Sequence, residues 1–118
     1  MTTGTFPERF RQLSDGLGAL AEALPAPMDG FSRLHRSAIT EGALDAKTKE
    51  LMALAIAVAV RCDGCIAFHV HDAVDAGATA DEIAEAIGVA ILMGGGPAAV
   101  YGADALRAYE EFTTQGQS

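Results

Sequence analysis

The 118-residue sequence has no tryptophan, only two cysteines and no excess of positive charge. Two cysteines are too few for the disulfide framework of a small secreted domain. Eight Lys and Arg stand against 16 Asp and Glu, which gives a formal net charge of −8. The phosphates of nucleic acids and of anionic membranes would repel such a chain. We therefore expect neither nucleic acid nor a membrane surface among its partners.

The sequence also lacks a segment that could cross a bilayer or direct secretion. The longest apolar run, residues 51–60, has ten residues, whereas a membrane-spanning helix needs about twenty. The first ten residues, MTTGTFPERF, contain neither the basic stretch nor the apolar core of a signal peptide. We expect a cytoplasmic protein, in which two closely spaced cysteines are more often catalytic or metal-binding than structural.

Apolar residues recur at helical spacing along most of the chain, without the alternation typical of strands. We predict an all-α fold of five or six helices, with Asp45 and Thr79 as N-caps. Proline and glycine should break the chain at residues 25–27 and 94–97. The expected helices cover residues 7–24, 28–39, 46–61, 63–76, 80–93 and 98–112. We expect residues 1–27 to be a helical extension, 28–112 the main domain and 113–118 a flexible tail.

The fourth expected helix carries both cysteines and two of the three histidines. Cys62 and Cys65 lie at its start, where a helix N-terminus favours the nucleophilic thiolate and two thiols can close a small disulfide ring. Helical periodicity places His69 on the same stripe as both cysteines. Asp72, one turn further, is expected to orient the His69 imidazole, whereas His71 points elsewhere. The sequence therefore predicts a redox-active dithiol with an adjacent histidine.

Glu50 stands at the entrance of the apolar third helix, twelve residues before Cys62. On one straight helix this separation would be about 18 Å, too far for a carboxylate to reach. Glu50 serves the cysteines only if the chain folds back or if another subunit supplies the carboxylate. We predict a bend at residues 61–64, because Asp63 and Gly64 are turn-forming residues. The residues alone also allow Glu50 simply to favour the helix dipole.

The pattern Glu50, eleven residues, Cys62-Asp63-Gly64-Cys65, three residues, His69 resembles the active-site signature of alkylhydroperoxidase D (AhpD)-like proteins of the carboxymuconolactone decarboxylase superfamily. The resemblance extends over roughly residues 28–110 and includes the segments GALD (42–45), DAGAT (75–79) and GGGP (94–97). It implies a compact helical bundle that assembles into a homo-oligomer, usually a trimer or hexamer. The sequence departs from the founding enzyme at Gly64, where that enzyme carries a second histidine.

The same resemblance implies a thiol-dependent peroxidase that reduces hydroperoxides. Cys65 would be the attacking thiol and Cys62 the resolving thiol, with Glu50 and His69 as the proton relay. The electrons would come from a thiol or lipoyl-type donor, and no cofactor or metal would be needed beyond the redox-active disulfide.

Four other interpretations remain open. The cysteines could be structural, or Cys62, Cys65 and His69 could hold zinc, although a structural zinc site needs a fourth ligand. The chain could be a lactone decarboxylase, which needs no dithiol, or a non-enzymatic redox-sensing oligomer. His35, between Leu34 and Arg36, is expected to be a structural helix residue.

Overall fold

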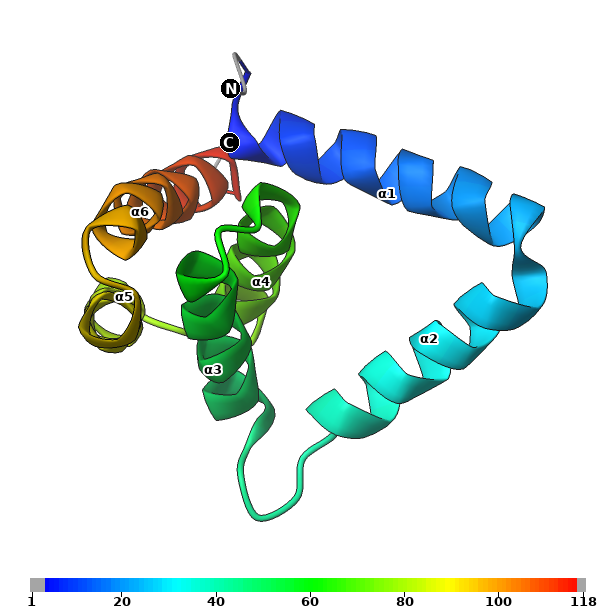
Figure 1. The fold of residues 1–118 in the computed structure, drawn as a ribbon, viewed down its shortest axis with the longest axis horizontal. Coiled ribbons are helices and arrows are strands. Elements are labelled where there is room, and N and C mark those ends of the chain that lie inside the picture. Colours follow the sequence, from blue (N-terminus) through cyan, green and yellow to red (C-terminus); the bar gives the residue numbers. More distant parts are fainter. Residues whose placement is uncertain (1–3, 117–118) are drawn as a thin grey trace.

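The computed structural model describes residues 4–116 and confirms the all-α prediction. Six helices and no strand are present in this part of the chain (Figure 1). Their bounds are α1 Phe6–Ala23, α2 Pro25–Ile39, α3 Ala46–Ala59, α4 Asp63–Asp75, α5 Ala80–Gly94 and α6 Gly96–Gly116.

Helices α3 to α6 form the core, in which α3 packs against α4 and α5, and α6 packs against α4 and α5. Its buried side chains are mostly small or β-branched, so that neighbouring helices approach closely. Among them are Leu54, Ala57, Val58, Ile66, Ala67, Val70, Ala73, Ile83, Ala90, Ala105 and Ala108. Helix α4, which carries Cys65 and has Cys62 as its N-cap, packs against both α3 and α6 of this core.

Helices α1 and α2 form an arm outside this core (Figure 1). The start of the arm is fixed to α6, because the Phe6 N–H donates to Glu111 Oε1 at 2.7 Å and the Arg107 guanidinium lies over the Phe6 ring. Helix α2 has no buried residue. The arm is thus anchored at one end and returns to the core as an exposed helix.

The break predicted at residues 25–27 is narrower than expected. Only Leu24 separates the two helices, and Pro25 is the first residue of α2. Proline fits the first turn of a helix because its missing N–H would have no intrahelical partner there. At the second predicted break only Gly95, with φ 71°, lies between α5 and α6.

The predicted helix caps are present. The Asp45 carboxylate accepts from the Thr48 N–H at 2.8 Å, and Thr79 and Glu82 form a capping box. The last helix runs to Gly116, so residues 113–116 extend α6 where a flexible tail was expected. The Thr113 hydroxyl donates to the Tyr109 carbonyl within that helix. Residues 117 and 118 of the expected tail, and 1–3 of the expected extension, lie outside the described residues.

Large apolar side chains remain exposed on several helices. Leu92 and Met93 of α5 are 79% and 78% exposed, and Ile56 of α3 is 61% exposed. No helix within residues 4–116 is both long enough and apolar enough to span a bilayer. Several of the exposed apolar side chains, including Val89, Leu92 and Met93, lie close together on α5.

Candidate active site at the start of α4

The predicted bend between α3 and α4 is confirmed. Arg61 has φ 61°, a left-handed conformation that is uncommon for any residue other than glycine. The Cys62 N–H donates to the Ala57 carbonyl at 3.0 Å and closes the turn. Helices α3 and α4 consequently pack side by side, which brings Glu50 back to α4 within the same chain.

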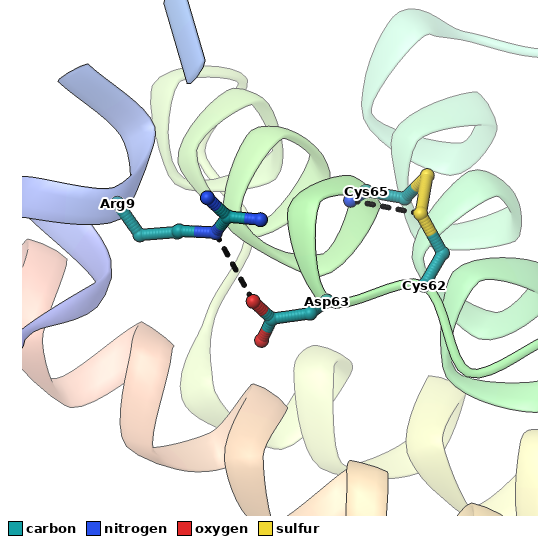
Figure 2. Close-up of a disulfide and its surroundings, with 4 residues drawn as sticks. All are labelled: Arg9, Cys62, Asp63 and Cys65. Carbon is teal, nitrogen blue, oxygen red and sulfur yellow. Dashed lines mark hydrogen bonds and ion pairs between the residues drawn. A yellow bond between two sulfur atoms is a disulfide. The ribbon is translucent and has the colours of Figure 1, made fainter. Parts of the chain in front are cut away.

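Cys62 and Cys65 form a disulfide at the N-terminus of α4 (Figure 2). Cys62 is the N-cap residue, and its sulfur accepts from the Cys65 N–H at 3.2 Å. Between the cysteines, Asp63 forms an ion pair with Arg9 of α1, with Arg9 Nε 3.1 Å from Asp63 Oδ2. The helix N-terminus that holds the pair would also stabilise a thiolate after reduction.

Glu50 is the buried charged residue of the described core, with 4% of its surface exposed. Its Oε1 lies 2.8 Å from His69 Nδ1. An ionised carboxylate only accepts hydrogen bonds, so Nδ1 carries the proton and donates it to Glu50. In the neutral ring, Nε2 is then left as the proton acceptor. This arrangement satisfies the buried carboxylate and leaves one ring nitrogen of His69 able to accept a hydrogen bond.

The disulfide and His69 line one cavity of about 590 Å³. Its walls are mainly apolar and come from the arm and from α4, with Phe10, Leu13, Leu17, Phe31 and Phe68 among the lining residues. The two cysteines therefore border an apolar space of ligand size.

Gly64 occupies the position where the resembled enzyme carries its second histidine. A Cβ atom there would lie 2.8 Å from Leu13 Cδ1 of α1. A side chain at this position would require the Leu13 side chain to move, so the glycine leaves room for Leu13 beside the start of α4.

The expectation that Asp72 orients His69 is wrong. Asp72 Oδ1 lies 2.9 Å from Nδ1 of its neighbour His71, and His69 takes Glu50 instead. The reason is that α3 lies alongside α4 and offers a buried carboxylate to His69. The His71 ring stacks on Phe10 with 4.0 Å between ring centroids, which agrees with its predicted position away from the cysteines.

His35 is a site residue that the sequence did not reveal. It lines the same cavity, and its ring centroid lies 6.4 Å from that of His69. One nitrogen of His35 also lies within 4.8 Å of carboxylate oxygens of Glu50 and Asp72. The residues next to His35 in the sequence do not indicate a functional site. His35 reaches the cavity only because α2 folds back towards α4.

The four residues predicted to carry the chemistry are thus brought together. Cys62, Cys65 and His69 line one cavity, and Glu50 is hydrogen-bonded to Nδ1 of His69. Their catalytic roles remain a prediction.

Residues 25–108 match the model of the carboxymuconolactone decarboxylase family. An uncharacterised protein of Cupriavidus necator is 39% identical over 102 residues, which cover 86% of this chain and 90% of that protein. Another, from the cox locus of Paracoccus denitrificans, is 39% identical over 98 residues, covering 83% and 88%.

Two solved structures are also similar. A carboxymuconolactone decarboxylase family protein from Legionella pneumophila is 45% identical, with a TM-score of 0.89 over 92% of this chain and 96% of that one. A family protein from Thermotoga maritima, for which a part in an antioxidative response has been suggested, is 30% identical. Its TM-score is 0.83, over 92% of this chain and 93% of that one.

Proposed function

This chain belongs to the carboxymuconolactone decarboxylase family, and on that premise we propose that it is a thiol-dependent peroxidase that reduces organic hydroperoxides. One observation carries the proposal: the disulfide of Cys62 and Cys65 opens to the same cavity as His69, whose other nitrogen is held by a buried carboxylate. A purely structural disulfide needs neither a cavity nor a base beside it.

In the first step the reduced Cys65 thiolate attacks the terminal oxygen of the hydroperoxide. The O–O bond breaks, the alkoxide takes up a proton and leaves as the alcohol, and Cys65 becomes a sulfenic acid. Cys62 is the N-cap residue of α4, and its sulfur accepts a hydrogen bond from the Cys65 N–H. The helix N-terminus lowers the free energy of a thiolate at either position.

In the second step Cys62 attacks the Cys65 sulfur. The S–S bond forms, the S–O bond breaks, and hydroxide leaves as water after protonation. An external thiol or lipoyl-type dithiol then reduces the disulfide by thiol exchange and is itself oxidised. The net reaction converts the hydroperoxide and the dithiol into the alcohol, water and the donor's disulfide.

The pair of Glu50 and His69 moves the protons in both steps. With Nδ1 donating to Glu50, Nε2 of His69 accepts the thiol proton and later returns it to the leaving oxygen. Glu50 stabilises the imidazolium that forms in between, because its carboxylate is buried and only 2.8 Å away. The apolar cavity wall suits the organic group of an alkyl hydroperoxide.

Steady-state turnover tests the proposal. Reduced protein, cumene hydroperoxide and dihydrolipoamide are mixed, and hydroperoxide consumption is followed. Cys65→Ser should abolish turnover. Cys62→Ser should stop after one equivalent, leaving a sulfenic acid that dimedone traps. The chain has no other cysteine, so unchanged turnover in Cys65→Ser would rule the proposal out. A single round of oxidation without turnover would instead favour a redox sensor.

A further inference from the structure

Three helices bring one metal-binding group each to the same place beside the cavity, where His35 and Asp72 line its wall. His35 comes from α2, Glu50 from α3 and Asp72 from α4, and one ligand atom of each lies within 4.8 Å of the other two. Three atoms with these separations share a point at most about 2.8 Å from each of them. Zinc bonds to histidine and carboxylate are about 2.0–2.2 Å long. The three side chains therefore need to close by less than about 1 Å to hold one ion.

Both carboxylates are already oriented by a neighbouring histidine. Glu50 Oε1 accepts from His69 Nδ1 at 2.8 Å, and Asp72 Oδ1 accepts from His71 Nδ1 at 2.9 Å. Hydrogen bonds to ligating groups from such outer partners are a regular feature of metal sites, where they fix the ligand's orientation. The second oxygen of each carboxylate is then available to a cation.

Burial adds a reason for a cation at this position. Glu50 is 4% exposed, and a second carboxylate oxygen lies within 4.8 Å of its own. Two carboxylates so close in a partly dry environment repel each other unless positive charge lies between or beside them. A divalent ion would neutralise both at once.

We propose that His35, Glu50 and Asp72 form a binding site for a divalent first-row transition metal ion such as Zn²⁺. An imidazole with two carboxylates suits zinc and its neighbours better than magnesium, which prefers oxygen ligands alone. Three protein ligands leave a coordination position for solvent. The site does not use the cysteines, so it differs from the zinc site of Cys62, Cys65 and His69 that the sequence left open.

The bound ion would tie the arm to the core. Helix α2 has no buried residue, and His35 itself is exposed. A bond from His35 to an ion that Glu50 and Asp72 hold would join α2 to α3 and α4. The inference does not depend on the proposed peroxidase activity.

Zinc titration of the oxidised protein tests the site, because the closed disulfide removes both thiols as ligands. The chelator-treated protein is titrated with Zn²⁺ by calorimetry. We expect one ion per chain, with affinity at least about tenfold weaker in His35→Asn and in Asp72→Asn. Asp75→Asn is the matched control, because Asp75 is an exposed acidic residue of the same helix. Its affinity should stay within about twofold of the parent.

Limited proteolysis provides a second readout. Zinc should protect the connection between α1 and α2 in the parent chain but not in His35→Asn, whose exposed side chain leaves folding unaffected. The proposal is overturned if the oxidised protein binds no zinc. It is equally overturned if both variants bind zinc as tightly as Asp75→Asn does.

Discussion

In the proposed mechanism, the proton transfers at the cavity depend on Glu50. A carboxylate that is 4% exposed lies 2.8 Å from His69 Nδ1, and a buried carboxylate needs such a partner. In the proposed mechanism, the hydrogen bond with Glu50 keeps a proton on Nδ1 of His69, and Nε2 accepts and returns the transferred proton. In this account Glu50 acts through His69 and is therefore a positioning residue.

Glu50→Gln should slow oxidation of the reduced cysteines about 100-fold, near the lower end of what general acid–base groups contribute. Glutamine keeps the size of the side chain but cannot stabilise an imidazolium ion. The rate is measured by stopped flow with one equivalent of hydroperoxide, across a pH series. A flattened pH profile should accompany the lower rate, which a merely structural change would not produce. Glu41→Gln, an exposed loop carboxylate, should leave the rate unchanged. A Glu50→Gln rate within twofold of the parent would contradict this role.

At the scale of single residues, the sequence predicts what helical periodicity controls. Cys62, Cys65 and His69 share a stripe because offsets of three, four and seven fix their positions on one helix. The partners of the histidines depend on how α2 and α3 pack against α4, which local spacing does not determine. Helical spacing therefore pairs Asp72 with the wrong histidine and predicts no function for His35.

At the scale of helices, the caps and breakers locate most boundaries. Asp45 and Thr79 cap α3 and α5 as expected, because their side chains accept from N–H groups that have no partner inside the helix. Proline is ambiguous, since it ends one helix and also fits the first turn of the next. For this reason α2 begins at Pro25, three residues before the predicted start.

Helices α5 and α6 cross closely at Gly102. A Cβ atom there would lie 2.6 Å from Ile87 Cγ2. Gly102→Ala should therefore destabilise the fold by about 1–3 kcal/mol, as overpacking in a core does. Gly88→Ala on α5 is the matched control, because a Cβ atom at Gly88 would meet no packing neighbour within 4 Å. It should be neutral or stabilising, since alanine favours helix. Urea unfolding compares the two variants, and equal free energies of unfolding would contradict the close crossing.

The N-cap of α3 should make part of the stability depend on pH. Hydrogen bonds from the Thr48 side chain and backbone N–H lower the pKa of Asp45 below its ordinary value of 3.8. Because the pKa of Asp45 is lower in the folded state, the ionised cap stabilises the fold at pH values above the ordinary pKa of 3.8. This stabilisation is lost as the pH falls through the lowered pKa. Asp45→Asn also caps a helix but does not titrate. Urea midpoints between about pH 5 and pH 2.5 should thus fall less steeply in this variant than in the parent. If the urea midpoints of the parent and of Asp45→Asn fall equally with pH, Asp45 is not the source of this pH dependence.

At the scale of the whole molecule, the single chain exposes more surface than a compact monomer of its mass. Its accessible area is 7037 Å², against about 6,100 Å² expected for 12.2 kDa. The radius of gyration is 14.3 Å, against about 13.5 Å for a compact domain of this length. A second copy of the chain that packed on the arm and on the exposed apolar side chains would reduce the exposed area per chain. We propose that the protein is a homo-oligomer.

Light scattering after size exclusion should give a mass at least twice the 12.2 kDa of one chain. Leu92→Glu should shift the protein towards the monomer, because Leu92 is 79% exposed beside Met93 at 78%. A carboxylate at the centre of an apolar interface costs several kcal/mol unless it finds a partner. Thr114→Glu, an exposed polar position on α6, is the control and should not change the mass. A monomeric parent protein would contradict the proposal.

The most direct measurement is the number of free thiols per chain before and after one equivalent of hydroperoxide. The account predicts two thiols in the reduced protein, none within seconds of adding the peroxide, and two again after treatment with a dithiol. Two thiols that persist in the presence of the peroxide would contradict it.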